Sequence, residues 1–358
     1  MTTKANEKGT AEWLPDCTPS SDIVKMATAN PATRAQADKR EDYYGVPLLK
    51  RPKWRWEIAL YFFFEGISAG SFLLGALADL SGNKRLRELA RTAYDVSILT
   101  LLPCPPLLIA DLGRPERFHH MLRVFKPMSP MNLGAWTLTG FSAPVTAITA
   151  LRLISDGSSS DQNKLVLRSR LGAVGLPFAL TMISYPGVLL STTSTPVWSR
   201  SRFLGALFAC SSIGNGAAAT SFALSWQKGN HNVALEHRAK IESTARICEG
   251  AALVTYLATS KDAARPLTKG RHSLLFWLGA VGCGLLLPVI WSDNRKQDKD
   301  HLRSRGKSMV RSVLSLAGGL ALKWAITHAG RQSADDVQAT RNATRPNKGA
   351  SGWDPAKQ

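Results

Sequence analysis

The sequence is organised around residues 107–118, which read LLIADLGRPERF. An apolar run ends there in an acid, a glycine, an arginine and a proline. Gly113 allows a turn, and Pro115 disfavours helical geometry at the residue before it. We therefore expect Asp111 and Arg114 where a lipid-soluble helix meets water or a polar cavity, unless they form a salt bridge that only holds the turn. The rest of the chain repeats this arrangement, with apolar runs joined by short basic loops.

The apolar runs place the chain in a membrane. Hydrophobic residues make up 44% of the 358 residues, and they gather in runs with few internal charges. Each run is about 18 to 26 residues long, enough for a helix to cross a hydrocarbon core about 30 Å thick. The mean hydropathy of −0.08 conceals these runs, because polar tails and loops dilute them.

The sequence predicts an all-α integral membrane protein, a bundle of about eight transmembrane helices with polar N- and C-terminal tails. The expected spans are 56–80, 94–111, 132–153, 171–194, 203–226, 243–260, 273–291 and 308–328. The second span must kink or break, because it contains Pro103, Pro105 and Pro106. The sixth span is the least hydrophobic of the eight.

Three parts of the chain follow from these spans. Residues 46–330 form the expected membrane domain, between a polar and largely disordered tail at 1–45 and a polar tail at 331–358. Small residues recur at close spacing inside the spans, as at Gly66 and Gly70. They predict helices that pack closely into a bundle.

The composition excludes several classes of function. The formal charge of +19 is spread over every loop, without zinc-finger or helix-turn-helix patterns, so we expect the lipid bilayer and no nucleic acid as a partner. The five cysteines include no C-x-x-C pair, which argues against an iron–sulfur cluster or another metal site in this chain. All seven histidines lie in loops or at span ends, whereas a membrane cytochrome holds haem with mid-span pairs.

Ionisable residues inside the spans are candidates for function, because each costs at least about 2.5–3.5 kcal/mol in the bilayer. Glu65 lies inside the first span and Glu249 inside the sixth. Asp79 follows Glu65 within about 40° of the same helix face and roughly 21 Å away, so the two can mark one polar track. Asp95 begins the second span and Asp111 ends it. A structural hydrogen bond or an interhelical ion pair is the alternative for each.

Two tyrosines accompany these acids. Tyr61 precedes Glu65 by one helical turn and shares its face. Tyr185 lies in the fourth span, before a proline and a glycine that deform the helix. Either phenol can donate a hydrogen bond to a quinone carbonyl, or serve only as a packing or interfacial aromatic.

Several runs of sequence carry a resemblance to a known family. They are YFFFEG at 61–66, DLGRPERF at 111–118, MLRVFKP at 121–127, SPM at 129–131 with Gly134 and Trp136, and VLLS at 188–191 with PVW at 196–198. Together they resemble the NrfD family, the membrane subunits of polysulfide reductase and related enzymes. The resemblance covers about residues 43–290, and Glu65 and Thr192 depart from the family pattern.

The resemblance implies a haem-free membrane subunit of a respiratory oxidoreductase, in the cell inner membrane of a bacterium. It would bind menaquinone or ubiquinone and carry no iron–sulfur cluster of its own. It would exchange electrons with a ferredoxin-like 4Fe-4S iron–sulfur subunit, which in turn would serve a molybdopterin catalytic subunit. Some members of the family are proposed to move protons.

The resemblance also assigns residues to a site. The quinone environment would comprise Tyr61, Glu65, Asp111, Arg114 and Tyr185. Within it the two carboxylates would relay protons, and Arg114 would stabilise charge that develops on a quinone oxygen. The remaining candidates for a proton relay are Asp79, Asp95 and Glu249.

Two other classes of function stay open beside the quinone-reactive anchor. Broken spans and intramembrane acids also suit a secondary transporter or an ion-conducting membrane protein, although no inverted repeat is visible. The protein can also be a purely structural anchor, which holds a soluble enzyme at the membrane without touching quinone. In either anchor reading, the molybdopterin chemistry belongs to a different polypeptide.

Overall fold

The computed structural model describes residues 49, 52, 54–154, 162–226, 232–270, 273–290 and 301–335. Every regular element in these residues is a helix, as the sequence predicts. The predicted tail at 1–45, and the residues of the C-terminal tail after 335, lie outside this part of the chain.

Six segments of the described chain are long and apolar enough to cross a bilayer. Five of them are the continuous helices α3 (Trp56–Leu80), α7 (Pro130–Ile154), α8 (Gln162–Ser191), α10 (Leu204–Trp226) and α14 (His301–Asp335). The sixth is interrupted, and comprises η1 (Lys84–Leu86), α4 (Arg87–Leu101) and α5 (Cys104–Asp111). The other elements are η2 (Pro115–Arg117), α6 (His120–Arg123), α9 (Pro196–Ser199), α11 (Asn232–Ser260), η3 (Lys261–Ala264), α12 (Arg265–Thr268), η4 (Leu275–Leu286) and α13 (Leu287–Ile290).

The predicted count of about eight spans is not confirmed. The expected sixth span lies in α11, which has 29 residues but carries charged side chains in its middle. The expected seventh span begins as η4, a π-helical segment of 12 residues, and continues into the short α13. The charged side chains Glu242, Arg246 and Glu249 of α11 are buried inside the bundle, so packing against other helices keeps α11 in place where its composition alone would not.

The proline break predicted in the second span is confirmed. Helix α4 ends at Leu101 and α5 begins at Cys104, with Pro103 as its N-cap and further proline in its first turn. Proline lacks the N–H that a continuous helix would need there. The break lets α5 pack against α3, and α5 then ends at Asp111.

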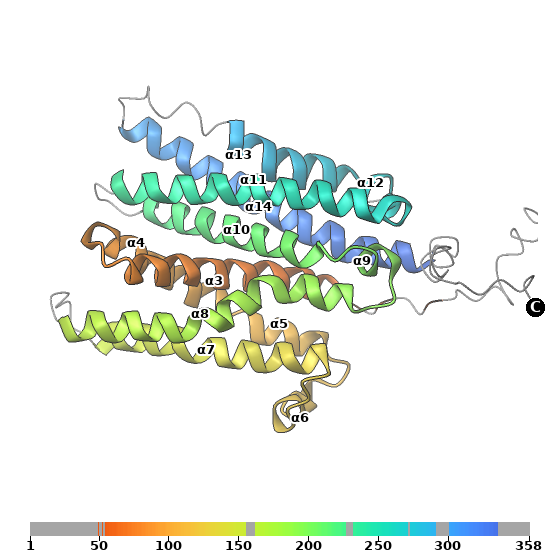
Figure 1. Ribbon diagram of the computed structural model, residues 1–358, viewed down its shortest axis with the longest axis horizontal. Coiled ribbons are helices and arrows are strands. Elements are labelled where there is room, and N and C mark those ends of the chain that lie inside the picture. The colour runs from red at the N-terminus through yellow and green to blue at the C-terminus, as the bar shows by residue number, and fades with distance from the viewer. Residues whose placement is uncertain are drawn as a thin grey trace, which may run out of the picture. The chain divides into compact units, whose positions relative to one another are not determined.

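Helix α3 is the centre of the bundle (Figure 1). It packs against α4, α8, α10 and α14, and 89% of its apolar stretch is buried, more than in any other span of the described chain. Helices α7 and α8 lie on one side of it, and α10, α11 and α14 on the other (Figure 1). The side chains of α3 therefore meet protein along most of its length, and its strongly exposed apolar residues, Trp56, Leu77 and Leu80, lie at its ends.

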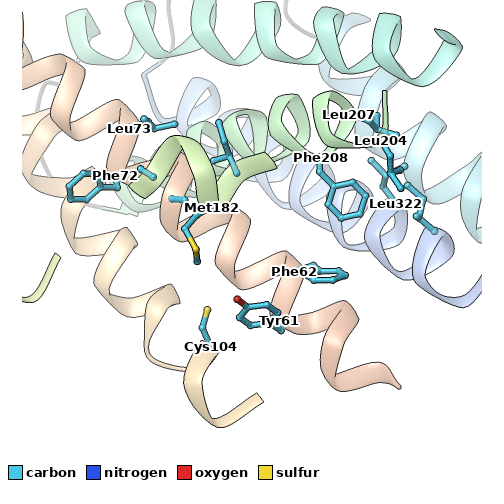
Figure 2. Close-up of a cluster of buried hydrophobic side chains, with 14 of the residues drawn as sticks. Tyr61, Phe62, Phe72, Leu73, Cys104, Met182, Leu204, Leu207, Phe208 and Leu322 are labelled. Atoms are coloured by element: carbon cyan, nitrogen blue, oxygen red, sulfur yellow. The ribbon is translucent and has the colours of Figure 1, made fainter. Parts of the chain in front are cut away.

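Aromatic side chains from several helices pack around α3 (Figure 2). The ring of Phe62 meets Phe208 of α10 edge-on, with 5.9 Å between centroids. The ring of Phe72 packs against Tyr94 of α4 at 5.4 Å and Phe141 of α7 at 5.2 Å. These contacts join α3 to three other helices, which fixes the position of its polar residues in the bundle.

Small residues allow α3 and α10 to cross in backbone contact, as their spacing predicts. A Cβ atom added at Gly70 would lie 2.2 Å from the carbonyl oxygen of Ser212. A Cβ atom added at Gly216 would lie 2.5 Å from the carbonyl carbon of Gly70. Neither position has room for a side chain.

Replacing Gly70 with alanine tests this contact. The added methyl group would overlap the Ser212 carbonyl oxygen, a backbone atom that cannot move aside without shifting α10. We expect the free energy of unfolding to fall by about 1–3 kcal/mol, measured by thermal unfolding of the purified protein in detergent. The control is Gly250→Ala in α11, because a methyl group there meets nothing within 4 Å. Equal melting temperatures for Gly70→Ala and the unmodified protein would contradict the contact.

Candidate functional site

A cavity of about 210 Å³ lies at the end of the bundle where α3 begins. Its walls come from the first two turns of α3, the end of α5, the loop after α5, the start of α7 and the end of α8. Most of the lining is apolar, with Trp54, Ile58, Phe62, Leu108, Met131 and Leu189 among its residues. The side chains in the lining that can form hydrogen bonds through oxygen are those of Tyr61, Asp111 and Tyr185. The cavity therefore offers an apolar slot with a few oxygen atoms at defined places.

Tyr185 is held against the start of α7. Its hydroxyl donates a hydrogen bond to the carbonyl oxygen of Pro130 at 2.8 Å. A Cβ atom added at Gly134 would lie 2.2 Å from the Tyr185 Cζ and hydroxyl oxygen, so the ring rests directly on the glycine. The SPM run and the glycine that follows it thus form the surface on which Tyr185 lies.

Asp111 lies half-buried in the cavity wall, among charged groups that the sequence did not suggest. Its carboxylate accepts a hydrogen bond from the backbone N–H of Arg55, and the charges of Arg55 and Arg331 act on it. The carboxylate of Glu57 is a further neighbour. These residues come from the start of α3 and the end of α14, so Asp111 connects three parts of the chain.

Arg114 lies away from this group. Its side chain is exposed in the loop after α5, and it is not part of the cavity lining. No ion pair joins Arg114 to Asp111 within the described residues, so neither the turn-holding salt bridge nor a place for Arg114 in the cavity is seen in this structure. The structure brings together Tyr61, Asp111 and Tyr185, and leaves Arg114 outside.

Glu65 is fully buried one turn deeper in α3 than the cavity lining. Neither of its carboxylate oxygens has a hydrogen-bond partner of good geometry among the described residues. The Tyr61 hydroxyl lies beside the carboxylate, and Tyr61 also lines the cavity. Figure 2 shows the Tyr61 ring leaving α3 next to Cys104 of α5. Tyr61 therefore links the buried acid to the cavity.

Lys323 of α14 is a further neighbour of Glu65. It is fully buried, and its ammonium group is near enough to Glu65 and Glu249 for their charges to act on it. Its Nζ donates to Ser212 Oγ at 3.4 Å and lies 4.3 Å from the centre of the Phe208 ring. Lys323 is thus a buried cation whose charge acts on the Glu65 carboxylate, and sequence reasoning missed it.

A second buried polar cluster joins α10, α11 and α14. Arg246 donates to Glu249 at 2.6 Å, to the Asn215 side-chain oxygen at 2.8 Å and to Ser315 Oγ at 2.6 Å. Ser315 Oγ in turn lies 3.5 Å from Glu242, which pairs with Arg311 at 2.6 Å. All of these residues are at most 5% exposed, so the cluster lies inside protein. Glu249, a predicted relay residue, is therefore one member of a connected network.

The other two predicted relay residues lie elsewhere. Both carboxylate oxygens of Asp79 accept hydrogen bonds from Arg168 of α8, at 2.7 and 2.5 Å. Asp95 pairs with Arg152, and both side chains are substantially exposed. The structure does not bring Asp79 into contact with Glu65, and it offers a local ion pair as the partner of each aspartate.

The loop between α5 and α7 forms the outer rim of the cavity. Asn132 organises it: its Oδ1 accepts from the Lys126 N–H at 2.7 Å, and its Nδ2 donates to the carbonyl oxygens of Met121 and Val124. The loop carries η2 and α6 and projects from the bundle (Figure 1). Its exposed residues include apolar and basic side chains, namely Arg114, Arg117, Phe118, Arg123, Val124, Phe125, Lys126 and Met128, and one acid, Glu116.

Metal ligation has little support in the described residues. No group of three or more His, Cys, Asp and Glu side chains lies close enough together there to hold a metal ion. Cys104, Cys210, Cys248 and Cys283 carry free thiols. The polar groups that the structure places at and beside the cavity are the phenols of Tyr61 and Tyr185, the carboxylates of Glu65 and Asp111, and the Lys323 ammonium.

Comparison with known proteins decides the family. Residues 48–334 match the sequence model of the family described as polysulphide reductase, NrfD. The chain belongs to the NrfD family. The predicted resemblance is confirmed, and the match extends beyond the recognised motifs to include α14 and Lys323. This NrfD-family protein is a multi-pass membrane protein.

Two of the relatives resemble the chain over most of its length, and a third resembles it over a short stretch. A polysulfide reductase chain from Wolinella succinogenes is 27% identical over 301 residues, which represent 78% of this sequence and 94% of the relative. Protein NrfD of Escherichia coli is 26% identical over 312 residues, which represent 78% of this sequence and 95% of the relative. A selenate reductase subunit from Mesobacillus selenatarsenatis is 34% identical over a shorter stretch of 76 residues, which represent 21% of this sequence and 18% of the relative.

The role of Asn132 in shaping the cavity rim can be tested by proteolysis. Asn132→Ala removes three hydrogen bonds to the loop backbone, so the exposed peptide bond after Arg123 should become several times more sensitive to trypsin. The measurement is limited proteolysis of the detergent-solubilised protein, followed by mass spectrometry of the fragments. Asn83→Ala, in the turn between α3 and α4, is the control and should leave this cleavage unchanged. An unaltered rate in Asn132→Ala would show that the loop is held in another way.

Proposed function

We propose that this NrfD-family protein is the quinone-reactive membrane subunit of a reductase complex, with quinone in the cavity of Tyr61, Asp111 and Tyr185. One observation carries the proposal. The Glu65 carboxylate is fully buried without a hydrogen-bond partner of good geometry in the described chain, and Tyr61 connects it to a largely apolar cavity. A buried carboxylate of this kind is expensive to maintain, which favours a role in proton transfer.

The cavity fits a quinone ring by its chemistry. Its apolar walls suit a flat hydrophobic ring, and its few oxygen atoms suit the two carbonyl groups. Its volume of about 210 Å³ is below the roughly 300–1,000 Å³ of sites that enclose a whole drug-sized ligand, so we expect it to hold the ring and leave the isoprenoid tail in lipid. The Tyr185 hydroxyl already donates to Pro130, so Tyr61 is the phenol better placed to donate to a bound ring.

Different residues around the cavity serve proton transfer on its inner side and at its rim. A quinone that is reduced takes up two electrons and two protons, and a quinol that is oxidised releases them. Tyr61 and Glu65 provide a proton route on the inner side of the cavity, because the phenol lies beside the carboxylate. Asp111 is half-buried at the rim and provides an exchange point toward the aqueous side.

The partner is proposed to dock on the loop between α5 and α7. This loop lines the cavity through Leu112, Gly113 and Met121, so a protein bound there lies next to the quinone. Its exposed apolar and basic side chains suit a stable interface with a partially acidic surface. Relatives that belong to polysulfide reductase and selenate reductase support a multi-subunit reductase. We assign the docking partner as a 4Fe-4S iron–sulfur subunit, with a molybdopterin catalytic subunit behind it, in the bacterial inner membrane.

In this arrangement Arg114 acts at the interface and not on the quinone. It stands in the exposed loop with Arg117, Arg123 and Lys126, where its charge can steer and hold an acidic partner. Electrons would enter from a cluster in that partner, which the loop holds beside the cavity. Arg114 is therefore proposed to bind the partner, in place of the expected role of stabilising charge on a quinone oxygen.

A second candidate function is proton translocation, favoured by the buried polar cluster. Lys323 is within the electrostatic reach of both Glu65 and Glu249, so it joins the cavity side to the Arg246 network. From Lys323 to Arg311 the polar groups extend twelve residues along α14, about 18 Å. Together with Glu65 they cover a large part of the membrane thickness, as a proton route must.

Replacing Glu65 with glutamine tests the quinone-reactive role. The amide keeps the size of the side chain but cannot carry a proton, so quinol-linked turnover of the purified complex should fall by about 10²–10⁴-fold. Asp95→Asn is the matched control, because it makes the same chemical change at an exposed ion pair far from the cavity. Its turnover should equal that of the unmodified complex.

The same experiment separates the alternative functions. Both variants should copurify with the partner subunits and pass electrons from an artificial dye at the normal rate, because neither change touches the loop between α5 and α7. A purely structural anchor predicts unchanged quinol-linked turnover in Glu65→Gln. A transporter predicts that no iron–sulfur protein copurifies with the unmodified protein. Either result would overturn the proposal.

A further inference from the structure

A second cavity, of about 290 Å³, lies at the opposite end of α3 from the quinone cavity. The quinone cavity is lined by Ile58 and Tyr61, whereas this one is lined by Ala78 and Asp79, so about 30 Å of helix separates the two ends. Its walls come from the end of α3, the turn into α4 and the first turns of α8. The proposed function gives it no role.

The lining of this cavity is strongly basic. It includes the guanidinium groups of Arg87, Arg168 and Arg170, with Asn83, Gln162 and Ser169 as neutral hydrogen-bonding groups. The only carboxylate among the lining residues is that of Asp79. Three positive charges therefore surround one negative charge.

The single acid is already neutralised. Arg168 occupies both oxygens of Asp79, and the side chains of this pair are only 13% and 5% exposed. Arg87 and Arg170 have no ion-pair partner within the described residues. Arg91 lies in the same region, because its charge and that of Arg168 both act on Arg152, whose own charge is paired with Asp95. The cavity thus has an excess of cations that a bound anion would satisfy.

The apolar residues around the cavity favour a lipid headgroup over a free anion as its ligand. Leu77 and Leu80 at the end of α3 are 58% and 48% exposed, and Val166 and Leu167 of α8 are 43% and 46% exposed. In a membrane helix such residues face acyl chains. The cavity therefore lies at the boundary between the lipid-facing surface of α3 and α8 and the polar end of the bundle, which is the level of lipid headgroups.

We propose that this cavity binds the phosphate group of an anionic phospholipid. The planar guanidinium groups of Arg87 and Arg170 match the oxygen geometry of a phosphate. The Asp79–Arg168 ion pair joins α3 to α8 in the wall of the same cavity. The acyl chains lie along the exposed apolar residues of α3 and α8. The bound lipid ties α3, α4 and α8 together at the end of the bundle away from the quinone.

Native mass spectrometry of the full-length protein in detergent tests this site, with phosphatidylglycerol, phosphatidylcholine and inorganic phosphate as separate probes. We expect retention of phosphatidylglycerol in preference to phosphatidylcholine, since the choline cation opposes the arginines. The double variant Arg87→Gln with Arg170→Gln should bind phosphatidylglycerol about 30-fold more weakly, because each basic residue contributes about fivefold. Each single variant should lose about fivefold, which keeps the test valid if the double variant is unstable.

The matched control is Arg200→Gln with Arg202→Gln, which removes two exposed arginines between α9 and α10. Its affinity for phosphatidylglycerol should equal that of the unmodified protein. Three results would overturn the proposal: equal binding of the two lipids, an unchanged affinity in the Arg87 and Arg170 variants, or a site that takes inorganic phosphate and not lipid.

Discussion

The burial of Glu65 opposite Lys323 inside an apolar bundle is the constraint on which the rest of the structure depends. A carboxylate and an ammonium group withdrawn from water are costly, and their mutual attraction offsets that cost only when other polar groups surround them. Ser212 and the face of the Phe208 ring do this for Lys323, whereas Glu65 has the Tyr61 hydroxyl beside it but no hydrogen-bond partner of good geometry among the described residues. Gly66, which follows Glu65 in α3, leaves room for this arrangement, because a Cβ atom added there would lie 2.6 Å from Ser212 Oγ and 3.5 Å from Lys323 Nζ.

The helices on the two sides of Glu65 and Lys323 enclose different kinds of interior. On one side α3, α5, α7 and α8 enclose an apolar cavity with a phenol connected to the buried acid. On the other side α10, α11 and α14 enclose a network of arginines and carboxylates that has almost no exposed surface. Glu65 and Lys323 stand between them within electrostatic reach of each other, so these two buried groups connect the proposed quinone chemistry to the proposed proton route.

The sequence predicts the parts of this arrangement that depend on local pattern. Run lengths predict most of the spans, Pro103 predicts the break in the second, and a charge inside an apolar run identifies Glu65. The same rule applied to Lys323, within the run LALKWAI, would have found its partner. The sequence cannot show that Arg168 forms an ion pair with Asp79, which lies 89 positions earlier, because that contact depends on tertiary packing. It also cannot show that Arg114 is exposed, because that depends on the conformation of the loop. The count of spans is not confirmed for a related reason, since buried polar contacts to α10 and α14 keep the polar α11 in the bundle.

The most direct test of this account is to locate quinone in the intact complex with a photoreactive quinone analogue, followed by mass spectrometry of the labelled peptides. The account predicts labels on the start of α3, around Asp111 and near Tyr185, and it predicts that native quinone competes them away. Competed labels confined to α11 and α14, or the absence of any label that native quinone displaces, would contradict it.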